Sequence, residues 1–141
     1  MATTERTEIF DIPLDKFYQV IADYESYPEF VDGVSATKIV ERSGSETVVE
    51  YSLNLIKKFS YTLKLTEDKP NGLSWELIKG DIFKFNSGSW QLKALDDGRT
   101  EVSYRLEVEF KGFAPKMVVN KLVSHNLPAM MQSYYQRALE L

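Results

Sequence analysis

Few residues of this chain have the types and spacing that catalysis requires. Its 141 residues include no cysteine and a single histidine, His125, which excludes a thiolate nucleophile, a disulfide and a Cys/His metal cluster. His125 falls on the polar side of the C-terminal segment, so we favour a surface role over a place in a catalytic triad. Asp96 and Asp97 are adjacent, but Gly98 follows them and the three residues are typical of a hairpin turn. Seven glycines occur singly and form no phosphate-binding loop. We therefore predict no catalytic residue, no metal site and no cofactor.

The polar groups of most interest are those expected beside apolar surfaces. Tyr51, Tyr61 and Tyr104 fall on the apolar side of alternating segments, and a buried tyrosine hydroxyl needs a hydrogen-bond partner. These hydroxyls could orient a ligand or serve as acids in an enol or aldol reaction. Three further polar residues lie near the apolar stripe of the C-terminal segment: Asn126, Ser133 and Arg137. Their partners are either a ligand or protein groups, and for Arg137 we favour the protein.

The C-terminal segment, Pro115 to Leu141, is predicted to form one long helix. Proline suits the first helical turn, where its missing N–H costs nothing. Apolar residues recur at steps of three and four and form one stripe: Val119, Val123, Leu127, Met130, Tyr134, Ala138 and Leu141. Polar residues lie opposite and should contact water: Lys121, His125, Gln132 and Gln136. A helix of this length needs a large apolar surface to pack on.

The rest of the chain is dominated by alternation with period two, which is typical of strands. A first strand is predicted at Thr7–Ile12, followed by a short helix opened by Pro13 and a second at Tyr24–Phe30. About six alternating runs separated by turns follow, from Val34 to Phe110. The alternation slips between Phe85 and Trp90, which predicts a bulge near Asn86 to Gly88.

Strands joined by short turns predict a curved antiparallel sheet of about seven strands, with one apolar face that the C-terminal helix must cover. This is an α+β architecture, and we expect residues 1–141 to form a single domain. A curved sheet closed over one helix can enclose an apolar cavity. The predicted ligand-binding residues are Val49, Tyr51, Leu53, Tyr61, Leu63, Trp75, Phe85, Trp90, Tyr104, Leu106, Val108, Val119, Val123, Asn126, Leu127, Met130 and Tyr134. The predicted entrance is formed by Tyr27, Phe30 and Val31.

Charge and hydropathy restrict the partners. The formal net charge is −4 and no basic block occurs, so we expect no nucleic-acid partner. No apolar run is long enough for a transmembrane helix and the first residues lack the pattern of a signal peptide. We expect a cytoplasmic protein, a monomer or a weak dimer, with at most a transient membrane contact through Lys57, Lys58 and Lys64.

Several motifs resemble those of a known superfamily. A strand ending at Ile12-Pro13 and a short helix precede Asp23-Tyr24-Glu25 and Tyr27-Pro28-Glu29-Phe30. Further along are Gly88-Ser89-Trp90-Gln91-Leu92 and Tyr134-Tyr135-Gln136-Arg137-Ala138. In this order they resemble the START-like, Bet v 1-like superfamily (SRPBCC), and more narrowly its polyketide cyclase/dehydrase and coenzyme-Q-binding START-domain group. The resemblance spans nearly the whole chain.

The resemblance implies a helix-grip fold, in which a curved sheet wraps a long helix around a hydrophobic cavity, with two short helices after the first strand. Members bind lipids, quinones, hormones or polyketides, some are aromatase/cyclases, and some resemble ribosome-association toxins. The quinone-binding and toxin branches often follow Tyr-Pro-x-Phe with a stretch containing Pro and Cys, whereas Val31-Asp32-Gly33-Val34 contains neither.

We therefore predict binding or transport of a small hydrophobic ligand, either a lipid, a quinone or a polyketide-like molecule. An aromatase/cyclase or dehydratase acting on a polyketide-like substrate is the alternative, and it would require a positioned acid or base. A third reading is an interaction protein with a vestigial cavity.

Overall fold

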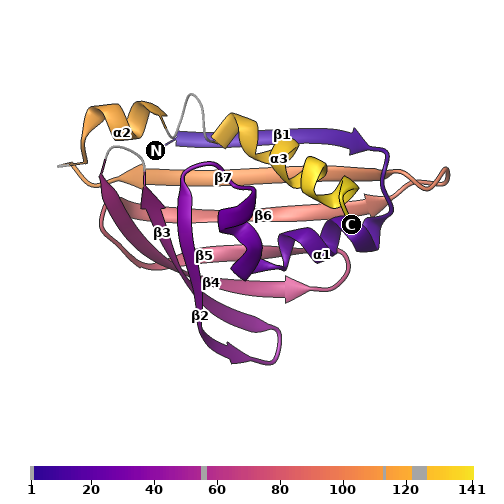
Figure 1. Cartoon of the computed structure of the whole chain (residues 1–141), viewed down its shortest axis with the longest axis horizontal. Helices are drawn as coiled ribbons and strands as arrows, with labels where there is room; N and C mark the ends of the chain where they lie inside the picture. Colours follow the sequence, from indigo (N-terminus) through magenta and orange to yellow (C-terminus); the bar gives the residue numbers. More distant parts are fainter. Residues whose placement is uncertain (1, 55–56, 113, 122–126) are drawn as a thin grey trace.

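A computed structural model describes residues 2–54, 57–112, 114–121 and 127–141 (Figure 1). Its elements follow the predicted order of one strand, two short helices, six strands and a helical C-terminal segment. In chain order they are β1 Ala2–Phe10, α1 Leu14–Ile21, the 3-10 helix η1 Tyr24–Glu29, β2 Val34–Ser43, β3 Glu46–Asn54, β4 Lys58–Asp68, β5 Gly72–Gly80, β6 Phe83–Ala94, β7 Thr100–Phe110, α2 Lys116–Lys121 and α3 Leu127–Leu139. The α+β architecture predicted from the alternation is confirmed.

The seven strands form one antiparallel sheet in the order β1-β7-β6-β5-β4-β3-β2. Strands β2 to β7 follow one another in the chain and in the sheet, because each is joined to the next by a turn that is too short to cross over. Gly44 and Gly98 occupy two of these turns with positive φ, a region that glycine adopts without strain. The first strand pairs with the last, and β1 and β2 are the two edges of the sheet (Figure 1).

Strand β1 is longer than predicted, because it begins at Ala2 rather than Thr7. It pairs with β7 from Ala2 opposite Val108 to Phe10 opposite Thr100. Its first residues are mostly polar and show little alternation, so backbone pairing with β7, rather than burial of side chains, sets its length. The prediction of a start at Thr7 was wrong for this reason.

Helix α3 covers the inner face of the sheet near β1 and β7 (Figure 1). It buries Met131, Tyr134 and Ala138, which recur at steps of three and four. The ring of Tyr135, the next residue of the helix, stacks on the ring of Phe10 in β1, with ring centroids 4.3 Å apart. The helix is therefore fixed to the sheet by aromatic contacts as well as by aliphatic burial.

The predicted helix Pro115–Leu141 corresponds to two described helices, α2 and α3, and residues 122–126, including His125, lie outside the described residues. The polar side predicted at Gln132 and Gln136 is exposed, as expected. The prediction that Leu141 belongs to the apolar stripe was wrong: α3 ends at Leu139 and the side chain of Leu141 is 49% exposed.

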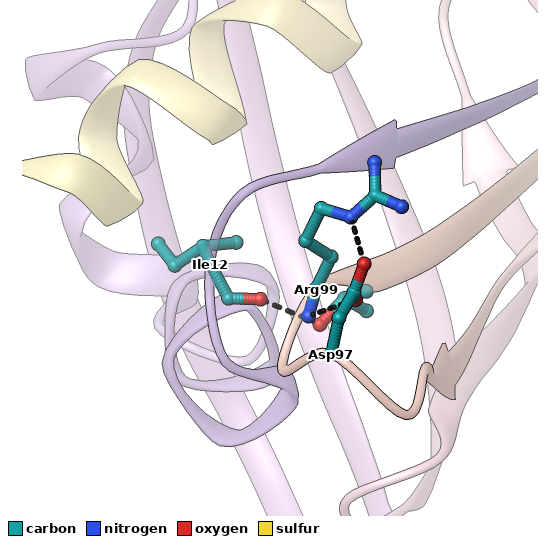
Figure 2. Close-up of polar contacts among 4 residues, drawn as sticks. Ile12, Asp97 and Arg99 are labelled. Carbon is teal, nitrogen blue, oxygen red and sulfur yellow. Dashed lines mark hydrogen bonds and ion pairs between the residues drawn. The ribbon is translucent and has the colours of Figure 1, made fainter.

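The turn between β6 and β7 is tied to the end of β1 (Figure 2). Asp97 accepts hydrogen bonds from the backbone N–H and the Nε of Arg99, and the backbone bond contributes most to lowering the pKa of this carboxyl. Next to it, the buried Thr100 hydroxyl donates to the carbonyl of Ile12 at 2.7 Å. The adjacent aspartates thus serve the hairpin turn, and Thr100 fixes where the chain leaves β1 for α1.

Candidate ligand-binding cavity

A cavity of about 100 Å³ lies between the inner face of the sheet, η1 and α3. Its wall is largely aromatic and aliphatic, with a few polar groups, as is common for sites of small molecules. The lining residues are Tyr27, Val31, Asp32, Val34, Tyr51, Leu53, Tyr61, Leu63, Leu65, Leu73, Trp75, Phe83, Asn86, Trp90, Tyr104, Leu106, Val108, Phe110, Met130 and Tyr134.

Most of the residues that the sequence predicted for this site lie on the wall of the cavity. Eleven of the predicted ligand-binding residues are on it: Tyr51, Leu53, Tyr61, Leu63, Trp75, Trp90, Tyr104, Leu106, Val108, Met130 and Tyr134. Of the predicted entrance, Tyr27 and Val31 also line the cavity, while Phe30 packs beside it against Tyr134.

The other predicted residues lie elsewhere. Val49 is wrong as a lining residue, because neighbouring side chains enclose it completely in the core. Val119 is half-buried on α2, away from the lining. Val123 and Asn126 lie outside the described residues, and for Leu127 only the backbone, at the start of α3, is described.

Phe85 was predicted to face the cavity and instead points outward, with its side chain 37% exposed. The cause is a β-bulge. Phe83 pairs with Phe110 and Phe85 with Glu109, so β6 carries one extra residue, Lys84, at this point. The bulge lies just before the predicted range of Asn86 to Gly88.

The position of the bulge leaves a polar residue facing the cavity. On β6 the inward positions are Trp90, Gly88 and Asn86 in regular alternation, and the extra residue then brings Phe83 inward in place of Lys84. Asn86 is 6% exposed and lines the cavity. A bulge at the predicted place, between Asn86 and Gly88, would have kept Phe85 on the inner face with Phe83. Because the bulge comes before Phe85, the wall carries a carboxamide here and not an aromatic ring.

The carboxamide of Asn86 is held by Trp75. Trp75 on β5 lies directly opposite Gly88 on β6, and its Nε1 donates to Asn86 Oδ1 at 3.1 Å. A Cβ atom on Gly88 would lie 2.4 Å from Trp75 Cζ2 and 2.4 Å from the carbonyl oxygen of Arg105. Only glycine leaves room for the indole to lie across the strand and reach Asn86.

Tyr134 connects the helical side of the cavity to the sheet. Its ring lies 5.3 Å from that of Tyr27, 5.2 Å from that of Phe30 and 4.9 Å from that of Trp90, measured between centroids. The first two contacts are edge-to-face, a favourable geometry for aromatic pairs. One side chain of α3 thus fixes both η1 and β6.

The 3-10 helix η1 is held against the sheet and α1 by hydrogen bonds from its tyrosine hydroxyls. Tyr24 donates from its hydroxyl to Glu67 Oε2 at 2.7 Å, and Thr47 reaches the same oxygen at 3.2 Å. The hydroxyl of Tyr27 donates to the carbonyl of Ile21 at the end of α1. Short helices have little stability of their own, so these bonds determine where η1 presents Tyr27 to the cavity.

A sequence profile of the family described as "Polyketide cyclase / dehydrase and lipid transport" matches residues 10–133. The chain belongs to this family. It is also similar to curated relatives over its whole length: it is 24% identical to the ribosome association toxin RatA of Vibrio cholerae serotype O1, covering 100% of this chain and 98% of that protein. With RatA of Pseudomonas aeruginosa the identity is 25%, covering 97% and 95%.

Solved structures support the family assignment at the level of fold. The Zhui aromatase/cyclase from Streptomyces sp. R1128 superimposes with a TM-score of 0.84 at 18% identity, covering 97% of this chain and 93% of that chain. A START superfamily protein from Mycobacterium smegmatis gives a TM-score of 0.81 at 17% identity, covering 98% and 97%. The START-like, Bet v 1-like fold and its helix-grip arrangement are therefore confirmed.

In this member of the family, the tyrosines on the cavity wall are held in their neutral form. Burial raises the pKa of Tyr51, Tyr61 and Tyr104 above the ordinary value, and neighbouring tyrosines add to the effect for Tyr51 and Tyr104. The rings of Tyr51 and Tyr61 stack at 4.9 Å. Their hydroxyls, and that of Tyr104, make no side-chain hydrogen bond within the described part of the chain. At neutral pH they can donate to a ligand or accept from one.

Ser133 and Arg137, two of the three polar residues predicted near the stripe of the C-terminal helix, bind protein groups, and Asn126 lies outside the described residues. Arg137 forms an ion pair with Glu29 at 2.8 Å and lies over the ring of Phe30. Its partners are therefore protein groups, as we favoured, and not a ligand. Ser133 bonds to the carbonyl of Ala129 in its own helix at 3.3 Å. Among the described residues, no group of three or more His, Cys, Asp or Glu side chains is placed to hold a metal ion.

Seven residues line the cavity without having been predicted to do so: Asp32, Val34, Leu65, Leu73, Phe83, Asn86 and Phe110. Most of them continue the alternation that identified their neighbours, so the same pattern could have found them. Asn86 carries no such signal, because a polar residue beside Phe85 is expected to point to solvent.

Proposed function

We propose that this protein binds a small hydrophobic molecule inside the cavity. The observation that carries the proposal is the cavity itself, a space of about 100 Å³ with a mainly apolar wall, in a family described by cyclisation and lipid transport. A close-packed core has few voids larger than a water molecule. Within the described residues, no helix is long and apolar enough to span a membrane.

The volume limits the ligand. Sites for drug-sized ligands enclose roughly 300–1,000 Å³, whereas an engineered apolar cavity of about 150 Å³ holds benzene. A space of about 100 Å³ is smaller than either, so a molecule with one ring already fills it. The long chain of a lipid or a quinone, or a polyketide with several rings, would need the wall to open.

Binding is favoured over catalysis by the chemistry of the wall. Acid–base catalysis of an enol or aldol reaction needs a base as well as an acid. The raised pKa of Tyr51 and Tyr104 keeps both hydroxyls protonated at neutral pH, so neither can abstract a proton. Among the described lining residues the one carboxylate is Asp32, which is exposed. The alternative function, an aromatase/cyclase or dehydratase activity, rests only on the fold that this protein shares with the Zhui aromatase/cyclase.

Association with ribosomes is a second candidate, favoured by the match to RatA over the whole chain. Charge argues against a large electrostatic contribution to such binding: the net charge is −4, and contacts with RNA phosphates depend on Lys and Arg. Co-sedimentation with ribosomal subunits from the source organism, at low and at moderate salt, tests it. Pelleting with subunits at both salt concentrations would support the second candidate.

The binding proposal is tested with isopropylbenzene, a neutral molecule with one ring. We expect saturable binding by isothermal titration calorimetry and a change in tryptophan fluorescence, because Trp75 and Trp90 line the cavity. Val108→Phe fills part of the space and should abolish binding. Its matched control is Val40→Phe, at an exposed position of β2, which should bind like the wild type. Equal binding by the two variants would refute binding in the cavity.

A further inference from the structure

We propose that Asn86 is a specificity-determining residue whose side-chain N–H donates to a carbonyl oxygen of the ligand, and that the ligand is a neutral molecule with one ring, such as an aromatic ketone, aldehyde or amide. This rests on the proposed function, since it assumes that the cavity is the binding site. It goes further by naming the chemical class and the protein group that selects it.

The orientation of the carboxamide follows from its partner. The indole Nε1–H of Trp75 is a donor only, so it must face the oxygen of Asn86, as it does at 3.1 Å. The Nδ2 group, with two donor hydrogens, is then directed elsewhere. It makes no hydrogen bond within the described residues, although the side chain is 6% exposed and lines the cavity.

A buried donor without a partner is costly, so native proteins rarely keep one unless something binds there. Two local features maintain this one. Asn86 pairs with the buried Val108 in the alternation set by Trp90 and so points inward, and Gly88 leaves room for the indole that fixes its oxygen. Bulges are frequent beside functional sites. A bulge between Asn86 and Gly88, instead of at Lys84, would have kept Phe85 inward and given an apolar wall at this point.

Charge and size define the rest of the ligand. No Lys, Arg or His is among the described residues that line the cavity, so a carboxylate ligand would be buried without a counter-charge. The wall nevertheless offers a carboxamide donor and neutral hydroxyls. A carbonyl group on a single ring matches the donor, a described lining without a cationic side chain, and the cavity volume of about 100 Å³.

The test compares acetophenone with isopropylbenzene, which are of similar size and have the same number of non-hydrogen atoms. Only acetophenone carries an oxygen acceptor. Calorimetry gives the ratio of their dissociation constants for the wild type and for Asn86→Leu, in which a side chain of similar shape has no donor. We expect the preference for acetophenone to fall about fivefold in the variant, the net effect of one neutral hydrogen bond. Val40→Phe should keep the wild-type preference.

A second measurement does not depend on the folding of the variant. The side-chain amide resonances of wild-type Asn86, assigned through their proximity to the Trp75 indole proton, should shift on adding acetophenone and shift less with isopropylbenzene. If both ligands bind and neither the ratio nor the resonances distinguish them, the inference is wrong and the proposed function stands. If neither these ligands nor decanoate binds, both fail. If decanoate binds and the two single-ring ligands do not, the inference on size and charge is wrong and the proposed function stands.

Discussion

Replacing Gly88 by alanine tests the arrangement that positions the cavity wall. The added Cβ would lie 2.4 Å from Trp75 Cζ2 and 2.4 Å from the backbone oxygen of Arg105. Neither distance is tolerable, so the indole must move away and the strand pair must separate slightly. Overpacking of this kind costs about 1–3 kcal/mol. Loss of the bond from Trp75 to Asn86 adds about 1 kcal/mol.

We therefore expect Gly88→Ala to lower the free energy of unfolding by about 2–4 kcal/mol, which corresponds to a fall in Tm of roughly 6–12 °C. Urea unfolding followed by tryptophan fluorescence measures it. Gly112→Ala is the matched control, because a Cβ there meets nothing within 4 Å. If both variants unfold like the wild type, the close contact between Trp75 and Gly88 does not exist in solution.

Three further predictions concern stability and motion. Because burial raises the pKa of the wall tyrosines above 10.0, unfolding releases protons above that pH. Urea unfolding should show little change in stability from neutral pH to pH 10 and a fall at higher pH, by about 1.4 kcal/mol per pH unit for each buried tyrosine. The fall should be shallower in Tyr104→Phe, and equal slopes would contradict the assignment. Thr100→Val leaves the carbonyl of Ile12 without the Thr100 hydroxyl and should cost about 1–3 kcal/mol in the same assay. The control Thr66→Val, at an exposed position of β4, should cause no measurable change. Hydrogen exchange across Tyr24 to Val34, the predicted entrance, should slow on binding isopropylbenzene; unchanged exchange there would place the entrance elsewhere.

Much of the fold could be predicted because each strand from β2 to β7 carries its own alternation and ends at a turn. In β7, Val102, Tyr104, Leu106 and Val108 are all buried, as period two requires. The same regularity located most of the cavity wall, since inward positions of neighbouring strands face a common space. Strand β1 lacked this signal, because its length depends on hydrogen bonds to β7 that the local sequence does not encode.

The residue most important for the proposed specificity could not be predicted. Hydropathy favours Phe85 inside and Asn86 outside. The slip in alternation predicts a bulge somewhere between Phe85 and Trp90, but the structure has it at Lys84. What decides its place is a tertiary arrangement: the indole of Trp75 crosses Gly88 and bonds to Asn86. A side-chain contact between two strands, such as this one between β5 and β6, cannot be read from the periodicity of either one.

The central claim, that the cavity holds a neutral molecule with one ring, is tested most directly by anomalous diffraction from crystals soaked in iodobenzene. The iodine atom marks the ligand without assumptions about affinity. We predict one dominant anomalous peak inside the wall formed by Tyr51, Trp75 and Tyr104, and its loss in Val108→Phe. Peaks confined to the protein surface, with none between the sheet and α3, would contradict the account.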